Sequence, residues 1–173
     1  MIKNQTIEKF LDSVASKTPT PGGGAVAAVT GAMAASLVEM VCNLTIGKKN
    51  YPKVQDEMIQ IAERASDLSV KLLDLADRDS EAFEKVMEAR KIGDKNKTKA
   101  ALLTAIEIPE KTAEYSENVR ELAEIVGKIG NTNAHSDAMS AEQLAFAAIQ
   151  SAQENIEINK KTIQALANLG KSK

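Results

Sequence analysis

Apolar residues recur every three or four positions along almost the whole chain of 173 residues. This spacing is typical of amphipathic helices, and no apolar–polar alternation bounded by hairpin turns indicates a strand. The pattern predicts five helices, over residues 6–16, 25–46, 52–90, 97–128 and 137–169. Gly47 should end the second helix, and Pro109 should kink or split the fourth. Because long helices joined by short connections favour antiparallel neighbours, we expect an all-α fold: an antiparallel bundle in one domain over residues 1–173.

The segment 25–46 is the most apolar of these helices and is rich in small residues. Gly31 and Ala35 are spaced as in paired membrane helices, but Ser36, Glu39 and Asn43 interrupt the run and no aromatic residues flank it. We therefore expect a buried core helix whose small residues allow close packing, and no membrane association. The first residues lack the apolar stretch of a signal peptide, which predicts a cytoplasmic protein.

Composition narrows the possible functions. The net charge of −2 leaves no basic stripe, and aromatic residues make up 3% of the chain with no Trp, so nucleic acid is not an expected partner. One Cys (Cys42) and one His (His135) cannot form a four-ligand zinc site. We expect Cys42 to be buried as a small apolar side chain, and we expect no metal.

Two features point to chemistry. The first is Gly22, Gly23 and Gly24, directly before a helix whose free backbone N–H groups can bind an anion. No Gly-Lys-Ser/Thr follows the glycines as in a Walker loop, and although Gly22-x-Gly24-x-x-Ala27 mimics the dinucleotide fingerprint, no strand precedes it. A flexible loop before the helix explains the glycines equally well. The second is Asp79, which falls on the buried stripe of the helix over residues 52–90, whereas Asp77 falls nearer its solvent side. A buried carboxylate needs a polar partner or a solvent-filled site, so Asp79 is either a proton-transfer group or a structural acceptor.

Further polar residues lie on or beside the helices. Asn43 shares a helix face with Glu39, and Asn155 and Asn159 are one turn apart, spacings that also suit helix–helix hydrogen bonds. Lys48 and Lys49 follow the end of a helix, where they could offset its dipole or bind a carboxylate.

The segment 130–137 gathers short polar side chains immediately before the last helix. Ser136 or Asp137 could cap this helix, and His135 is expected to be an ordinary loop residue.

Taken in order, these blocks resemble the formiminotransferase-cyclodeaminase C-terminal domain family. The matching blocks are TPTPGGGAVAA (18–28), MVCNLTIGKKNY (40–51), DSEAF (79–83), GNTN with SD (130–133 and 136–137) and NIEIN (155–159). The resemblance implies an all-helical antiparallel bundle that forms a homodimer, with each site in a groove lined by both subunits. It also implies a tetrahydrofolate derivative as substrate and no separate cofactor.

By this resemblance, the family's catalytic aspartate falls on Asp79. The substrate-binding positions it suggests are Gly22, Gly23, Gly24, Asn43, Lys48, Lys49, Asn133, Ser136, Asp137, Asn155 and Asn159. Because the sequence holds no formiminotransferase portion, we expect hydrolysis of 5,10-methenyltetrahydrofolate to 10-formyltetrahydrofolate. Two alternatives stay open: a formimidoyltetrahydrofolate cyclodeaminase that releases ammonia, and an inactive folate-binding helical dimer.

Overall fold

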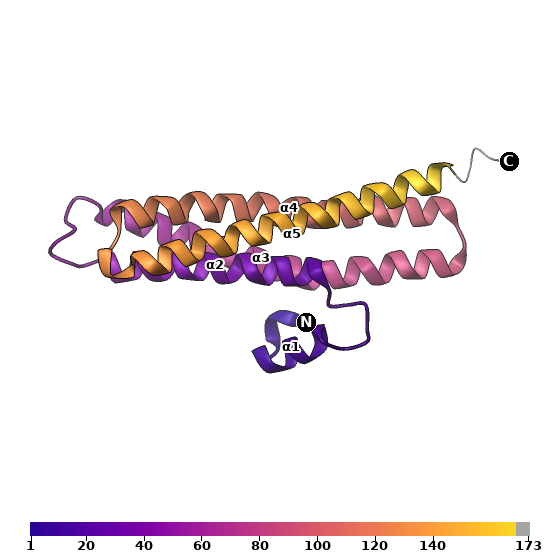
Figure 1. The fold of residues 1–173 in the computed structure, drawn as a ribbon, viewed down its shortest axis with the longest axis horizontal. Coiled ribbons are helices and arrows are strands. Elements are labelled where there is room, and N and C mark those ends of the chain that lie inside the picture. Colours follow the sequence, from indigo (N-terminus) through magenta and orange to yellow (C-terminus); the bar gives the residue numbers. More distant parts are fainter. Residues whose placement is uncertain (169–173) are drawn as a thin grey trace.

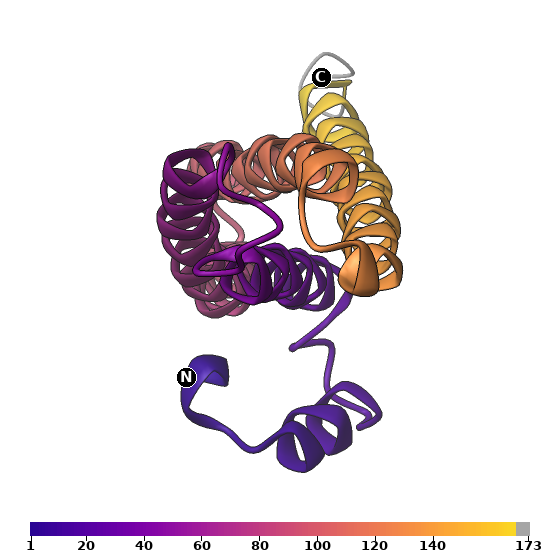
Figure 2. The same cartoon turned by 90° about the vertical axis from the view of Figure 1, so that its left-hand side faces the viewer.

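A computed structural model describes residues 1–168 and shows a bundle of four long helices (Figure 1). The helices are α2 (Gly23–Thr45), α3 (Gln55–Ile92), α4 (Lys95–Ile129) and α5 (His135–Asn168). Consecutive helices run in opposite directions and surround a common core (Figure 2). Before them come η1 (Ile2–Asn4) and α1 (Ile7–Val14), and η2 (Thr132–Ala134) joins α4 to α5. The expected all-α antiparallel bundle is confirmed.

The small residues of α2 let it pack closely against its neighbours. An added Cβ at Gly31 would lie 2.6 Å from Ser116 Oγ on α4 and 3.3 Å from the methyl groups of Leu72 on α3. Cys42 is fully buried, as expected, and burial raises the pKa of its thiol to about 12. α2 is long and apolar enough to cross a membrane by length and composition, but 56% of its most apolar stretch is buried inside the bundle.

The helix ends follow local chemistry. Thr6 Oγ1 accepts the N–H of Lys9 at the start of α1, and Asp94 accepts two N–H groups at the start of α4. Gly47 and Gly93 have φ values of +75° and +77°, a region that glycine enters without a Cβ clash. The predicted stop at Gly47 is therefore confirmed.

Three details of the helices differ from the prediction. α4 runs as one continuous helix through the buried Pro109, so the predicted split does not occur. α3 begins at Gln55, three residues after Pro52. α5 begins at His135, so Ser136 and Asp137 lie in its first turn and do not cap it. The predicted end of this helix at residue 169 lies outside the described residues.

Asp77 is the clearest correction within α3. It was placed near solvent, but only 7% of it is exposed, and its Oδ1 accepts the backbone N–H of Ile2. η1 covers this part of α3. The helical period within α3 could not show that Asp77 is buried, because the segment that covers it comes from the start of the chain.

Candidate active site

A groove opens where α2 begins, because α2 is much shorter than the helices around it. α2 has 23 residues and α3 has 38, so α3, α4 and α5 extend beyond the first turn of α2 (Figure 1). The groove has a volume of about 310 Å³. Apolar side chains from two helices form its walls, among them Phe83 and Val86 of α3 and Leu102 of α4.

Asp79 lies against the first turn of α2. A Cβ added at Gly24 would lie 2.6 Å from Asp79 Cγ and 2.7 Å from its Oδ2, so the carboxylate occupies the space that any larger residue would need. The carboxylate also accepts the backbone N–H of Ala25. Gly22 is the N-cap of α2 and has no side chain to accept such a bond. Asp79 of α3 therefore caps a neighbouring helix, and Gly24 makes this possible.

Two opposing effects act on the Asp79 carboxylate. Burial raises the pKa of Asp79 above its usual range, and the hydrogen bond from Ala25 lowers it by a smaller amount. No Lys, Arg or His side chain within residues 1–168 forms an ion pair with Asp79. A half-buried carboxylate with a raised pKa, open to a groove, is suited to accepting and returning a proton.

α5 supplies the polar wall of the groove. Asn155 and Asn159 both line it, and Asn155 Nδ2 donates to the carbonyl of Ser151 at 2.9 Å, which leaves the amide oxygen of Asn155 without a partner in the described residues. Gly23 lies close to Asn155, since an added Cβ would be 3.8 Å from Nδ2. The three glycines, Asp79 and the two asparagines thus meet in one place, as the resemblance implies.

Arg90 is a groove residue that the sequence interpretation missed. It lies on α3 in line with Asp79, Phe83 and Val86, at the spacings of three and four residues that define one helix face. Following the face of Asp79 along the helix would have found it. Arg90 brings a cation to a groove whose other charged group is a carboxylate.

The remaining suggested residues lie at the opposite end of α2, about 33 Å away at a rise of 1.5 Å per residue. Asn43 is exposed near the last turn of α2, and Lys48 and Lys49 are exposed in the loop that follows. Asn133 lies in η2 and is exposed. Ser136 and Asp137 lie in the first turn of α5, beside this loop and not at the groove. One protomer therefore does not bring these six residues to Asp79.

Comparison with known proteins agrees with the resemblance. The model of one family, described as formiminotransferase-cyclodeaminase, matches residues 6–169, which is nearly the whole chain. The chain belongs to the formiminotransferase-cyclodeaminase family. The match spans the glycine turn, Asp79 and the asparagines of α5, so every element that lines the groove lies inside the family region.

Members of this family with different names resemble the chain to different degrees. Methenyltetrahydrofolate cyclohydrolase of Methylorubrum extorquens is 44% identical over 93% of this chain and 82% of that enzyme. Formimidoyltransferase-cyclodeaminase of Sus scrofa is 29% identical, over 92% of this chain but 31% of that longer protein. The crystal structure of formiminotetrahydrofolate cyclodeaminase from Thermotoga maritima has a TM-score of 0.91 at 38% identity, covering 97% of this chain and 85% of that one.

Proposed function

We propose that this protein hydrolyses 5,10-methenyltetrahydrofolate to 10-formyltetrahydrofolate in the groove at the start of α2. The main support is the 44% identity to a methenyltetrahydrofolate cyclohydrolase, which extends over 82% of that enzyme. Asp79 adds further support, because it is a carboxylate that can accept a proton and it lies in a groove with apolar walls. The location that we propose, the cytoplasm, suits a folate substrate.

The reaction needs one proton acceptor beside a cationic carbon. Water adds to the methenyl carbon between N5 and N10, and the water proton passes to the Asp79 carboxylate. When the C–N5 bond breaks, Asp79 returns this proton to N5, and the hydroxyl proton of the tetrahedral carbon leaves to solvent. The charged carboxylate also stabilises the cationic substrate before attack. These steps use no metal or cofactor, so dialysis against EDTA should leave turnover unchanged.

The walls of the groove suit the parts of a folate. The apolar side chains of Phe83, Val86 and Leu102 can pack against the flat ring system, and the amides of Asn155 and Asn159 can bind its polar edge. Arg90 offers a cation for a substrate carboxylate.

The alternative reaction is cyclodeamination, in which N10 attacks the formimino carbon on N5 and ammonia leaves. It is favoured by the close structural match to the Thermotoga maritima cyclodeaminase. Both substrates should be assayed with the purified protein, with enzyme-free controls because the methenyl compound hydrolyses spontaneously. Turnover of the methenyl compound alone supports the proposal. Ammonia release from the formimino compound alone supports the alternative, and binding of both without turnover indicates an inactive folate-binding protein.

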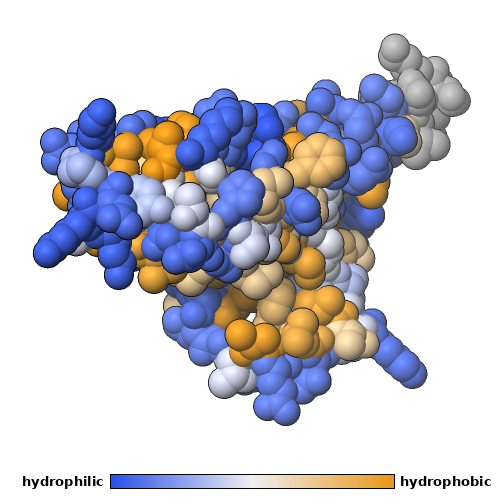
Figure 3. Space-filling model, turned by 60° about the vertical axis from the view of Figure 1, so that its left-hand side comes forward, coloured by the Kyte–Doolittle hydropathy of each residue, from blue (hydrophilic) through white to orange (hydrophobic). Residues whose placement is uncertain are grey.

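We also propose that the working form is a homodimer paired through α2. An apolar helix would normally be buried on all sides, yet Met33 is 49% exposed and Leu44 is 42% exposed. An apolar groove of about 500 Å³ lies over this face, lined by Val29, Met33 and Leu37. Figure 3 shows exposed apolar residues both on the helical bundle and on the N-terminal segment below it.

A two-fold axis across α2 would place the end of one α2 beside the start of the other. Lys48 and Lys49 of the partner subunit would then approach the groove of the first and could hold the glutamate tail of the folate. Such pairing accounts for the separation of these lysines from Asp79 within one protomer. Sedimentation should show a dimer at assay concentrations, and an active monomer would contradict it.

Mixed dimers test whether the site is shared. Asp79→Asn and Lys48→Ala chains, carrying different tags, can be co-expressed and the mixed dimer purified. If one site uses Asp79 of one chain and Lys48 of the other, the mixed dimer has one intact site and about half of the wild-type kcat/KM. If each site uses one chain only, no intact site exists and kcat/KM stays below that of the Lys48→Ala dimer.

A further inference from the structure

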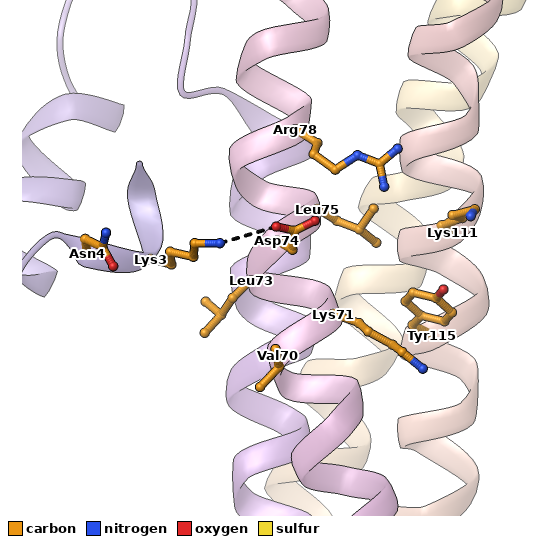
Figure 4. A pocket seen from close by; sticks show the side chains of 10 residues that line it. All are labelled: Lys3, Asn4, Val70, Lys71, Leu73, Asp74, Leu75, Arg78, Lys111 and Tyr115. Carbon is orange, nitrogen blue, oxygen red and sulfur yellow. Dashed lines mark hydrogen bonds and ion pairs between the residues drawn. The ribbon is translucent and has the colours of Figure 1, made fainter.

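A second cleft lies on the outer side of α3 and α4, away from the groove that holds Asp79. It has a volume of about 460 Å³, within the range of small-molecule sites. Figure 4 shows its residues coming from three elements: Lys3 from η1, Lys71 and Arg78 from α3, and Lys111 and Tyr115 from α4. Asp79 and the glycine turn are not among the residues of this cleft.

The cleft is strongly cationic in a chain that is acidic overall. Four of its lining residues are Lys or Arg and one, Asp74, is acidic, whereas the whole chain carries 22 basic and 24 acidic residues. Asp74 is already engaged, because its Oδ1 lies 3.3 Å from Lys3 Nζ. The excess positive charge is therefore local to this cleft.

Within residues 1–168, two of these cations have no side-chain partner: Arg78 and Lys111 form no hydrogen bond or ion pair with another side chain. In Figure 4 the Arg78 guanidinium extends from α3 toward the α4 side, where Lys111 and the hydroxyl of Tyr115 lie. Lys71 is held elsewhere, since it pairs with Asp67 at 2.6 Å and lies 5.7 Å from the centre of the Tyr115 ring.

The rest of the lining is apolar. Val70, Leu73 and Leu75 lie on the α3 side, and the ring of Tyr115 lies on the α4 side. A guanidinium from α3 and an ammonium and a hydroxyl from α4 line the same cleft, and together they suit an acid group with several acceptor oxygens. The apolar lining suits a molecule with an organic body attached to that group.

We propose that this cleft binds a small organic anion, with its phosphate or carboxylate group between Arg78 and Lys111 and its body against Val70, Leu73 and Tyr115. The anion neutralises two cations that have no ion-pair partner within residues 1–168. The site is separate from the groove and does not depend on the proposed reaction.

Isothermal titration calorimetry on the full chain at low salt tests the proposal with three probes: inorganic phosphate, AMP and γ-linked triglutamate. We expect saturable binding of one AMP or triglutamate per chain, tighter than that of inorganic phosphate because of the apolar lining. The better of the two organic probes identifies the acid group that the site prefers. Arg78→Gln and Lys111→Gln should each weaken binding at least tenfold.

Matched control variants distinguish a specific anion site from nonspecific attraction of the anion to a positively charged surface. Arg64→Gln on α3 and Lys99→Gln on α4 remove exposed cations outside the cleft and should leave the dissociation constant within about twofold. Asp79→Asn should also leave it unchanged. Absence of saturable binding by all three probes overturns the proposal, and so does equal weakening by the cleft and control variants. All the substituted cations are exposed, so circular dichroism should show intact helices throughout.

Discussion

The two ends of α2 are equally rich in the residues that the sequence singles out, but hydrogen bonds between neighbouring segments close one end and the other end opens into a groove. At the carboxyl end, Asn131 donates its backbone N–H to Thr45 Oγ1 at 2.9 Å and its side-chain amide to the Leu44 carbonyl at 2.8 Å. The Tyr51 hydroxyl accepts the N–H of Thr132 at 3.0 Å. At the amino end, Asp79 has one backbone partner and faces a groove.

These hydrogen bonds join α2 and the loop after it to the segment between α4 and α5, while Asp79 and the asparagines at the amino end face a groove that can take a ligand. The lengths of the helices explain the difference. At its carboxyl end α2 meets the loops that close the bundle, and at its amino end it stops short of α3, α4 and α5 (Figure 1). Within one protomer, polar residues near a helix end therefore line a groove only where the neighbouring helices continue past that end.

Asp79→Asn should have the largest effect at the amino end. Loss of the proton acceptor should lower kcat by about 1,000-fold, within the range for general acid–base groups. The protein should become more stable at neutral pH. Because burial raises the pKa of Asp79 above its unfolded value, its stabilising contribution is full below the unfolded pKa and is lost as pH rises through the folded pKa.

Thermal unfolding and kinetics on the same sample check both parts. The gain in melting temperature at pH 7 should shrink as the pH falls through the raised pKa of Asp79. Wild-type turnover should fall over that same range, since only the carboxylate accepts the proton. Full activity with lowered stability would assign Asp79 a structural role.

Gly24→Ala should be the next most damaging change. The added methyl group must displace the Asp79 carboxylate, so we expect kcat/KM to fall by about 100-fold. Gly23→Ala is the matched control, because its Cβ would meet only Asn155 Nδ2 at 3.8 Å, an ordinary contact. Equal loss of activity in both variants would mean that the turn tolerates no side chain at all, and that the contact with Asp79 is not the cause.

Lys48→Ala tests the carboxyl end of α2. A charge-assisted contact with the folate tail is worth about 1.5 kcal/mol, so its loss should raise KM about tenfold. Such a contact is remote from the reacting carbon, so kcat should hardly change. Lys49→Ala serves as the comparison, and mono- and polyglutamylated substrates should be measured with both. Wild-type KM for both variants on both substrates would exclude the lysines from tail binding.

Thr45→Val should have the smallest effect and should act on stability alone. Thr45 is buried, and its hydroxyl donates to the Val41 carbonyl and accepts the N–H of Asn131. Its loss leaves that N–H unpaired at a cost of about 1 kcal/mol in the free energy of unfolding. Chemical denaturation measures this cost, and kcat per folded enzyme should be that of the wild type. A large loss of turnover would mean that Thr45 and Asn131 contribute to the active site.

Much of the architecture could be predicted because it depends on local chemistry. The 3.6-residue period predicted the long helices. A glycine directly after an apolar run predicts a helix end with positive φ, as Gly47 has. The same period placed Asp79 on the buried face of its helix. The glycines and the asparagines of α5 joined it through the family resemblance and not through any local rule.

What the sequence misplaced depends on contacts between distant segments. Asp77 is buried because η1 covers it, which no pattern inside α3 reveals. Pro109 stays within one helix because its ring is packed in the core. The predicted helix over residues 25–46 already separates Lys48 from the glycines by its length, but the position of Asp79 at the glycine end follows only from the packing of α3 against α2.

The contact between Gly24 and Asp79 also makes the site a sensor of correct folding. The Asp79 carboxylate and Gly24 come from two consecutive helices, and neither has its final surroundings until α2 has docked against α3. A loosely packed intermediate can hold every helix and still lack the groove. Recovery of turnover during refolding should therefore follow the locking of side chains in the core, and lag behind the return of helical circular dichroism.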